Sequence, residues 1–116
     1  MLREHPTMRP IVFAGDSVTD CDRLTDPAGL GHGYVALVAA RIASRNLHVV
    51  NRGISGNRIR DLKARWAADI TAQDPALISV LIGINDTWRR FDSNDPTSSE
   101  QFEADYRAIL DQCAGI

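Results

Sequence analysis

The stretch Ile11-Val12-Phe13-Ala14-Gly15-Asp16-Ser17 joins a short apolar run to a glycine and two polar residues. The β-branched and aromatic side chains at residues 11–14 predict a buried strand, and the glycine predicts that this strand ends abruptly. A serine directly after such a strand lies where the chain turns out of the sheet. This junction is the first of three of its kind, and together they decide the fold.

Two further apolar runs, residues 47–50 and 77–82, are also predicted strands, and each is followed by glycine and polar residues. Between the first two strands, residues 16–33 are predicted to be a long loop, and residues 34–46 carry apolar side chains with helical spacing. Asn57 can cap a second helix, which has four apolar residues on one face: Ile59, Leu62, Trp66 and Ile70.

After the third strand, a polar loop around residues 92–96 precedes a third helix, because residues 97–100 have the spacing of a capping box. The apolar side of this helix is predicted to contain Phe102, Tyr106, Leu110 and Cys113. The order β-α-β-α-β-α predicts a parallel sheet in the strand order 2-1-3, with helices on both faces. In such α/β sheets ligands bind beyond the carboxyl ends of the strands, where the strand order reverses.

Composition limits the classes of function. The chain has 116 residues, enough for one domain, with 44% hydrophobic and 24% charged residues and a net charge of −2. This charge predicts neither nucleic-acid nor membrane binding. Residues 1–10 lack an apolar run, so we expect a cytoplasmic protein, with Cys21 and Cys113 as free thiols. The aspartates of residues 16–26 do not fit a calcium loop, and we expect neither metal nor cofactor.

The three strand ends also carry residues suited to one kind of chemistry. Ser17 supplies a hydroxyl and a backbone N–H, Gly53 lets a backbone N–H approach a ligand, and Asn85 supplies a neutral side-chain donor. Two N–H groups and an amide directed at one point form an oxyanion hole for a developing negative charge. A phosphate held by the glycine-rich loop of residues 15–19 is an alternative use of the same strand end.

The motifs at these positions resemble the first three signature blocks of the SGNH (GDSL-type) hydrolases. The matching blocks are residues 13–20 (FAGDSVTD), residues 51–57 (NRGISGN) and residues 83–86 (GIND). The resemblance implies a three-layer flavodoxin-like fold without a cofactor. It further implies Ser17 as nucleophile, Asp16 as a support of the loop, and an oxyanion hole made by the Ser17 and Gly53 N–H groups and Asn85. The implied substrate is a small ester with a short acyl group, for instance acetyl on a carbohydrate.

The chain departs from the family at its end. The fourth signature, an aspartate and a histidine three residues apart, is absent, so the resemblance covers the front part of the domain only. We therefore expect residues 1–116 to form a domain whose C-terminal part is missing, with further βα units normally following. Without the base, a serine hydroxyl is a poor nucleophile, so little turnover is expected from this chain. An inactive fragment or a binding module that retains the pocket is the alternative.

Three further expectations concern the surroundings of the site. Trp88 and Arg89 follow Asn85 closely and are predicted to lie on the substrate rim. His32 is the alternative base. It lies in a glycine-rich stretch, and the resemblance implies a structural role for it. The run 77–82 is apolar on both faces, yet in a three-stranded sheet it lies at an edge, which predicts self-association through that edge.

Overall fold

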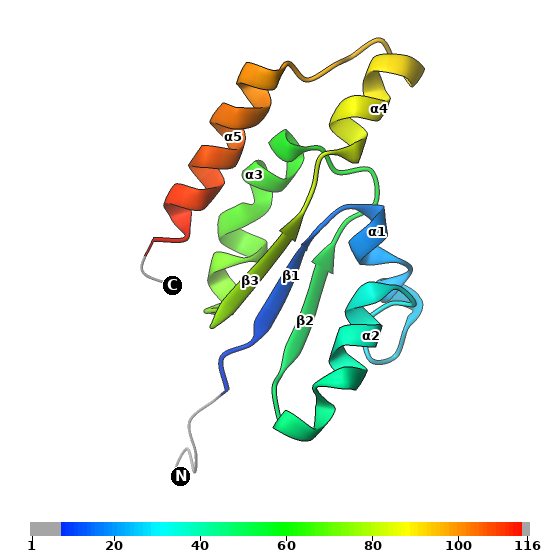
Figure 1. Ribbon diagram of the computed structural model, residues 1–116, viewed down its shortest axis with the longest axis vertical. Coiled ribbons are helices and arrows are strands. Elements are labelled where there is room, and N and C mark those ends of the chain that lie inside the picture. The colour runs from blue at the N-terminus through cyan, green and yellow to red at the C-terminus, as the bar shows by residue number, and fades with distance from the viewer. Residues whose placement is uncertain (1–7, 115–116) are drawn as a thin grey trace.

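The computed structural model describes residues 8–114, and its centre is one parallel sheet. Strands β1 (Ile11–Gly15), β2 (Val49–Gly53) and β3 (Leu77–Leu81) lie in the order β2-β1-β3 (Figure 1). In the register of the sheet, Phe13 of β1 is opposite Asn51 of β2 and Ser79 of β3. The predicted strand order and parallel pairing are confirmed, and all three strands point their carboxyl ends toward the same edge.

Helices cover both faces of this sheet. The α-helices are α1 (Ser17–Asp20), α2 (Tyr34–Arg41), α3 (Ile59–Asp69), α4 (Ile84–Asp92) and α5 (Ser99–Gln112). Short 3₁₀ turns follow α1, α2 and α3, at Arg23–Thr25, Ala43–Arg45 and Thr71–Gln73. In Figure 1, α3 and α5 lie side by side along one side of the sheet and α2 lies along the other.

Alternation of side chains along β1 explains this layering. Val12 and Ala14 point to the same face and join a fully buried cluster of apolar residues from α3 and α5: Ile59, Leu62, Trp66, Ile70 and Ile109. Phe13 points to the opposite face, where its ring meets the Tyr34 ring of α2 edge to face at 5.8 Å. The predicted apolar face of the second helix is therefore confirmed as the main core.

The structure corrects several predicted boundaries. The stretch 16–33, predicted as a loop, contains α1 and a 3₁₀ turn, and the helix predicted over 34–46 ends at Arg41. The second strand begins at Val49 and continues to Gly53, beyond the predicted run 47–50. The strand continues through the polar residues Asn51 and Arg52 because they pair with β1, a tertiary contact that the apolar pattern does not reveal.

A helix that the sequence analysis did not predict, α4, follows β3 directly. Gly83 makes the turn with φ of 136°, a backbone conformation that favours glycine, and the chain enters the helix at once. The expected polar loop around residues 92–96 follows the end of this helix at Asp92. Many of the helix residues are polar or charged, so no apolar periodicity indicated a helix there.

Two predicted helix caps are also wrong by one residue. The N-cap of α3 is Arg58, not Asn57. The backbone N–H of Arg58 donates to the Asp61 carboxylate at 2.9 Å. At the start of α5, the Gln101 N–H donates to the hydroxyl of Ser98, not to that of Thr97.

On α5, Ile109 and Asp105 are the buried residues. Phe102, Tyr106 and Cys113 pack partly against the core, and Leu110 is 53% exposed.

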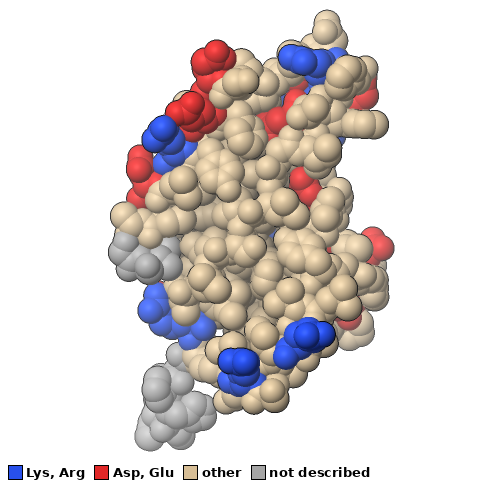
Figure 2. All heavy atoms as spheres, viewed as in Figure 1, with Lys and Arg blue, Asp and Glu red and all other residues tan. Residues whose placement is uncertain are grey.

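The outer edge of β3 is unpaired among the described residues. Leu77 and Leu81 pair with Ile11 and Gly15, and therefore share the Phe13 face, where they are 58% and 48% exposed. Figure 2 shows a mostly uncharged surface over the middle of the molecule in this view, with charged side chains gathered toward its ends. Within residues 8–114, no helix is both long and apolar enough to cross a membrane.

Candidate active site

The nucleophile candidate Ser17 lies where β1 turns into α1. Gly15 is required at this turn, because a Cβ there would lie 2.3 Å from Thr19 Oγ1 and 2.5 Å from the Leu81 carbonyl oxygen. Asp16 is buried and caps α1, since its Oδ1 accepts the Val18 N–H at 3.0 Å. Ser17 is exposed, and within the described residues neither its hydroxyl nor its N–H has a hydrogen-bond partner.

Asn51 holds the loops behind this turn together, although the sequence analysis assigned it no separate role. Its buried Nδ2 donates to the Thr19 carbonyl at 2.7 Å and to the Leu30 carbonyl at 2.8 Å. Its Oδ1 accepts the Gly53 N–H at 2.9 Å. One buried amide therefore joins the end of β2, the nucleophile helix and the glycine-rich loop.

Gly53 consequently does not fit its predicted role. Its N–H is already donated to Asn51, so it is not free to bind an oxyanion. A Cβ on Gly53 would lie 2.3 Å from the Asp20 backbone nitrogen. The glycine is needed because α1 packs directly against it, not because a ligand does.

Gly56, three residues later, has the properties that the sequence analysis assigned to Gly53. It has φ of 86°, a conformation that favours glycine, and its missing Cβ faces open space. The nearest atom to the Cβ position is Arg89 Nη2 at 3.8 Å. Among the described residues its N–H has no partner, so it is free to donate to a ligand. The sequence signal that could have identified Gly56 is its place as the second glycine of the same motif.

Asn85 lies in the first turn of α4 and keeps part of its donor capacity free. Its Nδ2 donates to the Asn57 carbonyl at 3.1 Å, which orients the amide and leaves one of its two N–H groups uncommitted. The loop after β2 is also tied to the nucleophile turn, because the Ile54 N–H donates to the Gly15 carbonyl at 3.0 Å. Ser55 adds a link, since its N–H donates to Asp20 at 3.1 Å. The three strand-end loops therefore meet at one edge of the sheet (Figure 1).

The two predicted rim residues differ. Trp88 is 56% exposed on α4. Arg89 is half-buried, lies beside Gly56, and is paired with Asp92 at 2.8 Å. Arg89 is therefore adjacent to the free donors, whereas Trp88 projects from the helix.

Among the described residues, no hydrogen bond joins Ser17 to either histidine. The His32 N–H donates to the Cys21 carbonyl at the C-terminal end of α1, whereas Ser17 begins that helix. The His48 carbonyl accepts the Ile11 N–H at the amino end of the sheet, opposite the strand ends. The geometry gives no support to His32 as a base.

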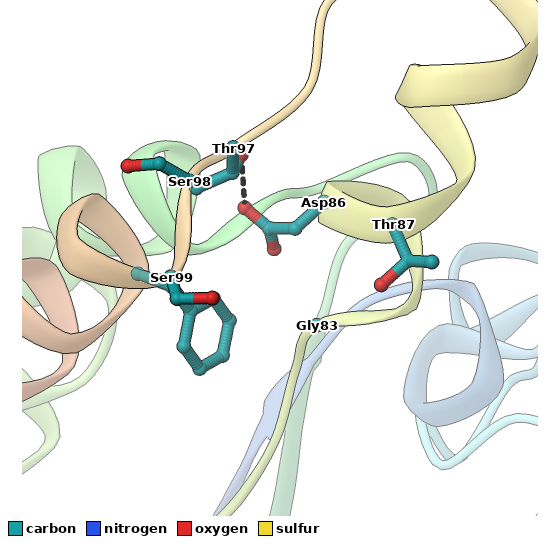
Figure 3. Close-up of a pocket in the computed structure, with 7 residues that line it drawn as sticks. Gly83, Asp86, Thr87, Thr97, Ser98 and Ser99 are labelled. Carbon is teal, nitrogen blue, oxygen red and sulfur yellow. Dashed lines mark hydrogen bonds between the residues drawn. The ribbon is translucent and has the colours of Figure 1, made fainter.

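A cavity of about 400 Å³ opens beside the Asn85 turn, between the starts of α4 and α5. Figure 3 shows its polar residues, with the Asp86 carboxylate pointing toward Thr97. Asp86 is buried, and it accepts the Thr97 hydroxyl at 2.7 Å and the Ile59 N–H at 3.0 Å. Its carboxylate therefore ties together the starts of α3, α4 and α5. The cavity is lined by Gly83, Asp86, Thr87, Thr97, Ser98, Ser99 and Phe102.

Comparison with known families decides how these loops are classified. Residues 13–116 match the GDSL-like lipase/acylhydrolase family, a stretch that contains all three strand-end motifs. The chain belongs to this family. Its sheet order and its exposed Ser17 at the end of β1 are thus features of a GDSL-like chain.

Curated and solved relatives of this GDSL-like chain are esterases and hydrolases. An acetylxylan esterase from Geobacillus stearothermophilus is 44% identical over 110 residues, which cover 86% of this chain and 50% of that protein. A crystal structure of a catalytic mutant of an acetylxylan esterase from the same organism matches with a TM-score of 0.83 at 39% identity, covering 90% of this chain and 53% of that one.

A further solved structure comes from a different source. LAE5, an alpha/beta hydrolase enzyme from the metagenome of Lake Arreo in Spain, matches with a TM-score of 0.80 at 36% identity. The match covers 91% of this chain and 55% of LAE5. The chain thus spans about half the length of the curated relative that it matches.

Proposed function

We propose that this chain carries the nucleophile and the oxyanion-binding loops of a serine carboxylic-ester hydrolase. The observation on which this depends most is the exposed Ser17, unpaired among the described residues, on a turn held by the buried Asp16 cap. The family match and the 44% identity to an acetylxylan esterase support ester hydrolysis over other uses of a serine at a strand end.

In the proposed reaction, Ser17 Oγ attacks the ester carbonyl carbon, and the electron pair of the carbonyl bond moves onto its oxygen. The Ser17 N–H, the Gly56 N–H and the free N–H of Asn85 hold that oxyanion. Removing one such donor from a serine hydrolase typically costs about 2.7–4 kcal/mol of activation free energy. Collapse of the intermediate expels the alcohol, which takes up the proton lost by Ser17, and water then releases the acid.

The substrate we propose is a small ester with a short acyl group, such as an acetylated carbohydrate, because the relative is an acetylxylan esterase. Arg89 lies beside Gly56 and is placed to contact the substrate at the rim of the site. A base must remove the Ser17 proton, and the sequence holds no aspartate and histidine three residues apart. We therefore expect the chain alone to hydrolyse esters slowly unless a base is supplied.

The test uses imidazole as an external base. p-Nitrophenyl acetate hydrolysis by the chain is measured at rising imidazole concentration, and the rate with Ser17→Ala is subtracted. We expect a saturable component that depends on Ser17 and persists in Ser44→Ala, a control serine exposed on the 3₁₀ turn after α2. A fluorophosphonate probe should label the chain at Ser17 under the same conditions.

Equal rates for the wild type and Ser17→Ala at every imidazole concentration, together with no labelling, would contradict the proposal. If inorganic phosphate then raises the melting temperature and Ser17→Ala abolishes this rise, the strand end is an anion-binding loop instead.

A separate experiment tests the proposed acyl preference. The rate of acetate release from an acetylated xylo-oligosaccharide is compared with the rate of hydrolysis of an ester with a longer acyl group.

A further inference from the structure

Arg65, on the inward-facing side of α3, reaches the ends of two strands at once. Its Nη2 donates to the Gly15 carbonyl at 3.1 Å, and its Nε donates to Asn57 Oδ1 at 2.7 Å. Its Nη1 pairs with Asp69, one turn later on the same helix, at 3.1 Å. The side chain is 14% exposed. All three nitrogens of the guanidinium are therefore engaged at defined positions.

The first contact acts on the peptide that leads into the nucleophile turn. The Gly15 carbonyl accepts two hydrogen bonds, one from Arg65 and one from the Ile54 N–H at 3.0 Å. Because Gly15 is separated from Ser17 by a single residue, the orientation of this carbonyl sets the direction in which the chain leaves β1. Two donors on one carbonyl leave that peptide little freedom to rotate.

The second contact acts on the loop that presents the free donors. Arg65 holds the side chain of Asn57, while the Asn57 carbonyl accepts Asn85 Nδ2 at 3.1 Å. The Asn57 N–H donates to Ile54, which closes the turn that contains Gly56. One residue thus connects Arg65 to both the Gly56 turn and the Asn85 amide.

We propose that Arg65 is a positioning residue that sets the distance between Ser17 and the donors of Gly56 and Asn85, without touching the substrate. This inference rests on the proposed function. Arg65 lies outside all three motifs. It acts by joining the Gly15 carbonyl to Asn57 across the space between β1 and the β2–α3 loop. An arginine suits this role, because its planar fork makes several hydrogen bonds at fixed angles, which the single ammonium of lysine cannot do.

Charge around the guanidinium is consistent with a fixed, largely buried cation. Burial lowers the pKa of Arg65, and the hydrogen bond and charge of Asp69 oppose this shift. Arg23 and Arg52 also lower it, so the side chain lies in a cationic neighbourhood. The guanidinium nevertheless stays protonated, as arginine does in proteins. Asp69 therefore holds a charged fork whose other donors face the two loops.

The kinetic test is Arg65→Lys in the assay with imidazole, with the Ser17→Ala rate subtracted. Displacing reacting groups by about 1 Å can cost about a hundredfold in rate, so we expect a loss of tenfold or more in kcat with little change in KM. The matched control is Arg60→Lys on the same helix, whose side chain reaches Thr97 only at 3.5 Å, and kcat should not change. Added guanidinium should restore part of kcat to Arg65→Ala, whereas it should not change Arg60→Ala.

A second readout does not depend on turnover. In ¹⁵N NMR spectra, the Asn85 side-chain NH₂ and the Gly56 amide should shift in Arg65→Lys and keep their wild-type positions in Arg60→Lys. If Arg65→Lys does not fold, Asn57→Ala removes the Nε acceptor alone and should give smaller changes at the same signals. Unchanged signals together with unchanged kcat would overturn the inference. If the wild type has no turnover that depends on Ser17, the proposed function fails, and the NMR shifts still decide the role of Arg65.

Discussion

Gly53 and Gly56 lie three residues apart in one motif but meet opposite surroundings. Gly53 is covered by the backbone of α1 and donates its N–H to Asn51. Gly56 faces open space, and its N–H has no partner among the described residues. The first glycine therefore allows two segments to pack closely, and the second provides a free donor in a left-handed turn. At this scale, hydrogen-bond partners distinguish a structural residue from a candidate functional one.

Alanine substitution should separate these two roles by stability. In Gly53→Ala the new Cβ would lie 2.3 Å from the Asp20 nitrogen. Overpacking of this kind typically costs about 1–3 kcal/mol. Gly56→Ala has space for its Cβ and is strained by its positive φ alone, which costs about 1 kcal/mol. Urea denaturation should therefore show a larger fall in the free energy of unfolding for Gly53→Ala. Equal losses would mean that α1 does not pack against Gly53 in solution.

At the scale of elements, the packing of α3 against α5 combines an apolar contact with a charged one. Ile109 of α5 joins the core around Trp66, and beside it the buried Asp105 pairs with Lys63 at 3.2 Å. Burial disfavours the charged carboxylate, but hydrogen bonds from Gln101 and Lys63 outweigh that penalty, so the pKa of Asp105 lies below its ordinary value. The ionised form therefore stabilises the docked helix.

This lowered pKa gives a prediction with a definite sign. A carboxylate with a lower pKa in the folded than in the unfolded chain stabilises the fold above its ordinary pKa of 3.8, and the stabilisation is lost as the pH falls through the folded-state pKa. We expect Asp105→Asn to lower the free energy of unfolding at pH 7 and to have a smaller effect in strong acid. Urea denaturation at several pH values measures this difference. A constant difference between the two proteins would contradict the assignment.

At the scale of the whole molecule, β3 is an edge strand with an apolar face. Leu77 and Leu81 lie on the same face of the sheet as Phe13 and are 58% and 48% exposed there, and the outer edge of β3 has no partner among the described residues. Unpaired apolar edges favour pairing with another strand. The relatives are about twice as long as this chain, so their sheets have additional chain available to cover such an edge.

The exposed edge predicts self-association of the 116-residue chain. The molar mass, measured by sedimentation or light scattering, should rise with protein concentration. Leu77→Lys places a charge on the edge, a feature that natural proteins use to prevent such pairing, and should keep the chain monomeric. The matched control is Leu37→Lys on α2, which removes a leucine that is 69% exposed but distant from β3. A monomer at all concentrations, or equal effects of both substitutions, would contradict the prediction.

The sequence alone determined the parts of this protein that depend on local pattern. Apolar runs located the strands, alternation with helices predicted the parallel order 2-1-3, and the position of Ser17 after β1 made it the candidate nucleophile. Hydrophobic periodicity carries this information because buried faces repeat along each element. The partly polar α4 lacked a clear signal of this kind and was not predicted.

Only the tertiary structure decided which groups at the strand ends are free. The N–H of Gly53 is not free because it donates to Asn51, and Arg65 is proposed as a positioning residue because α3 brings it to Gly15, fifty residues away in the chain. Hydrogen-bond partners of this kind come from segments that are distant in sequence, so no local pattern records them. The sequence therefore located the edge of the sheet where the chemistry is expected, and packing determined which donors remain available there.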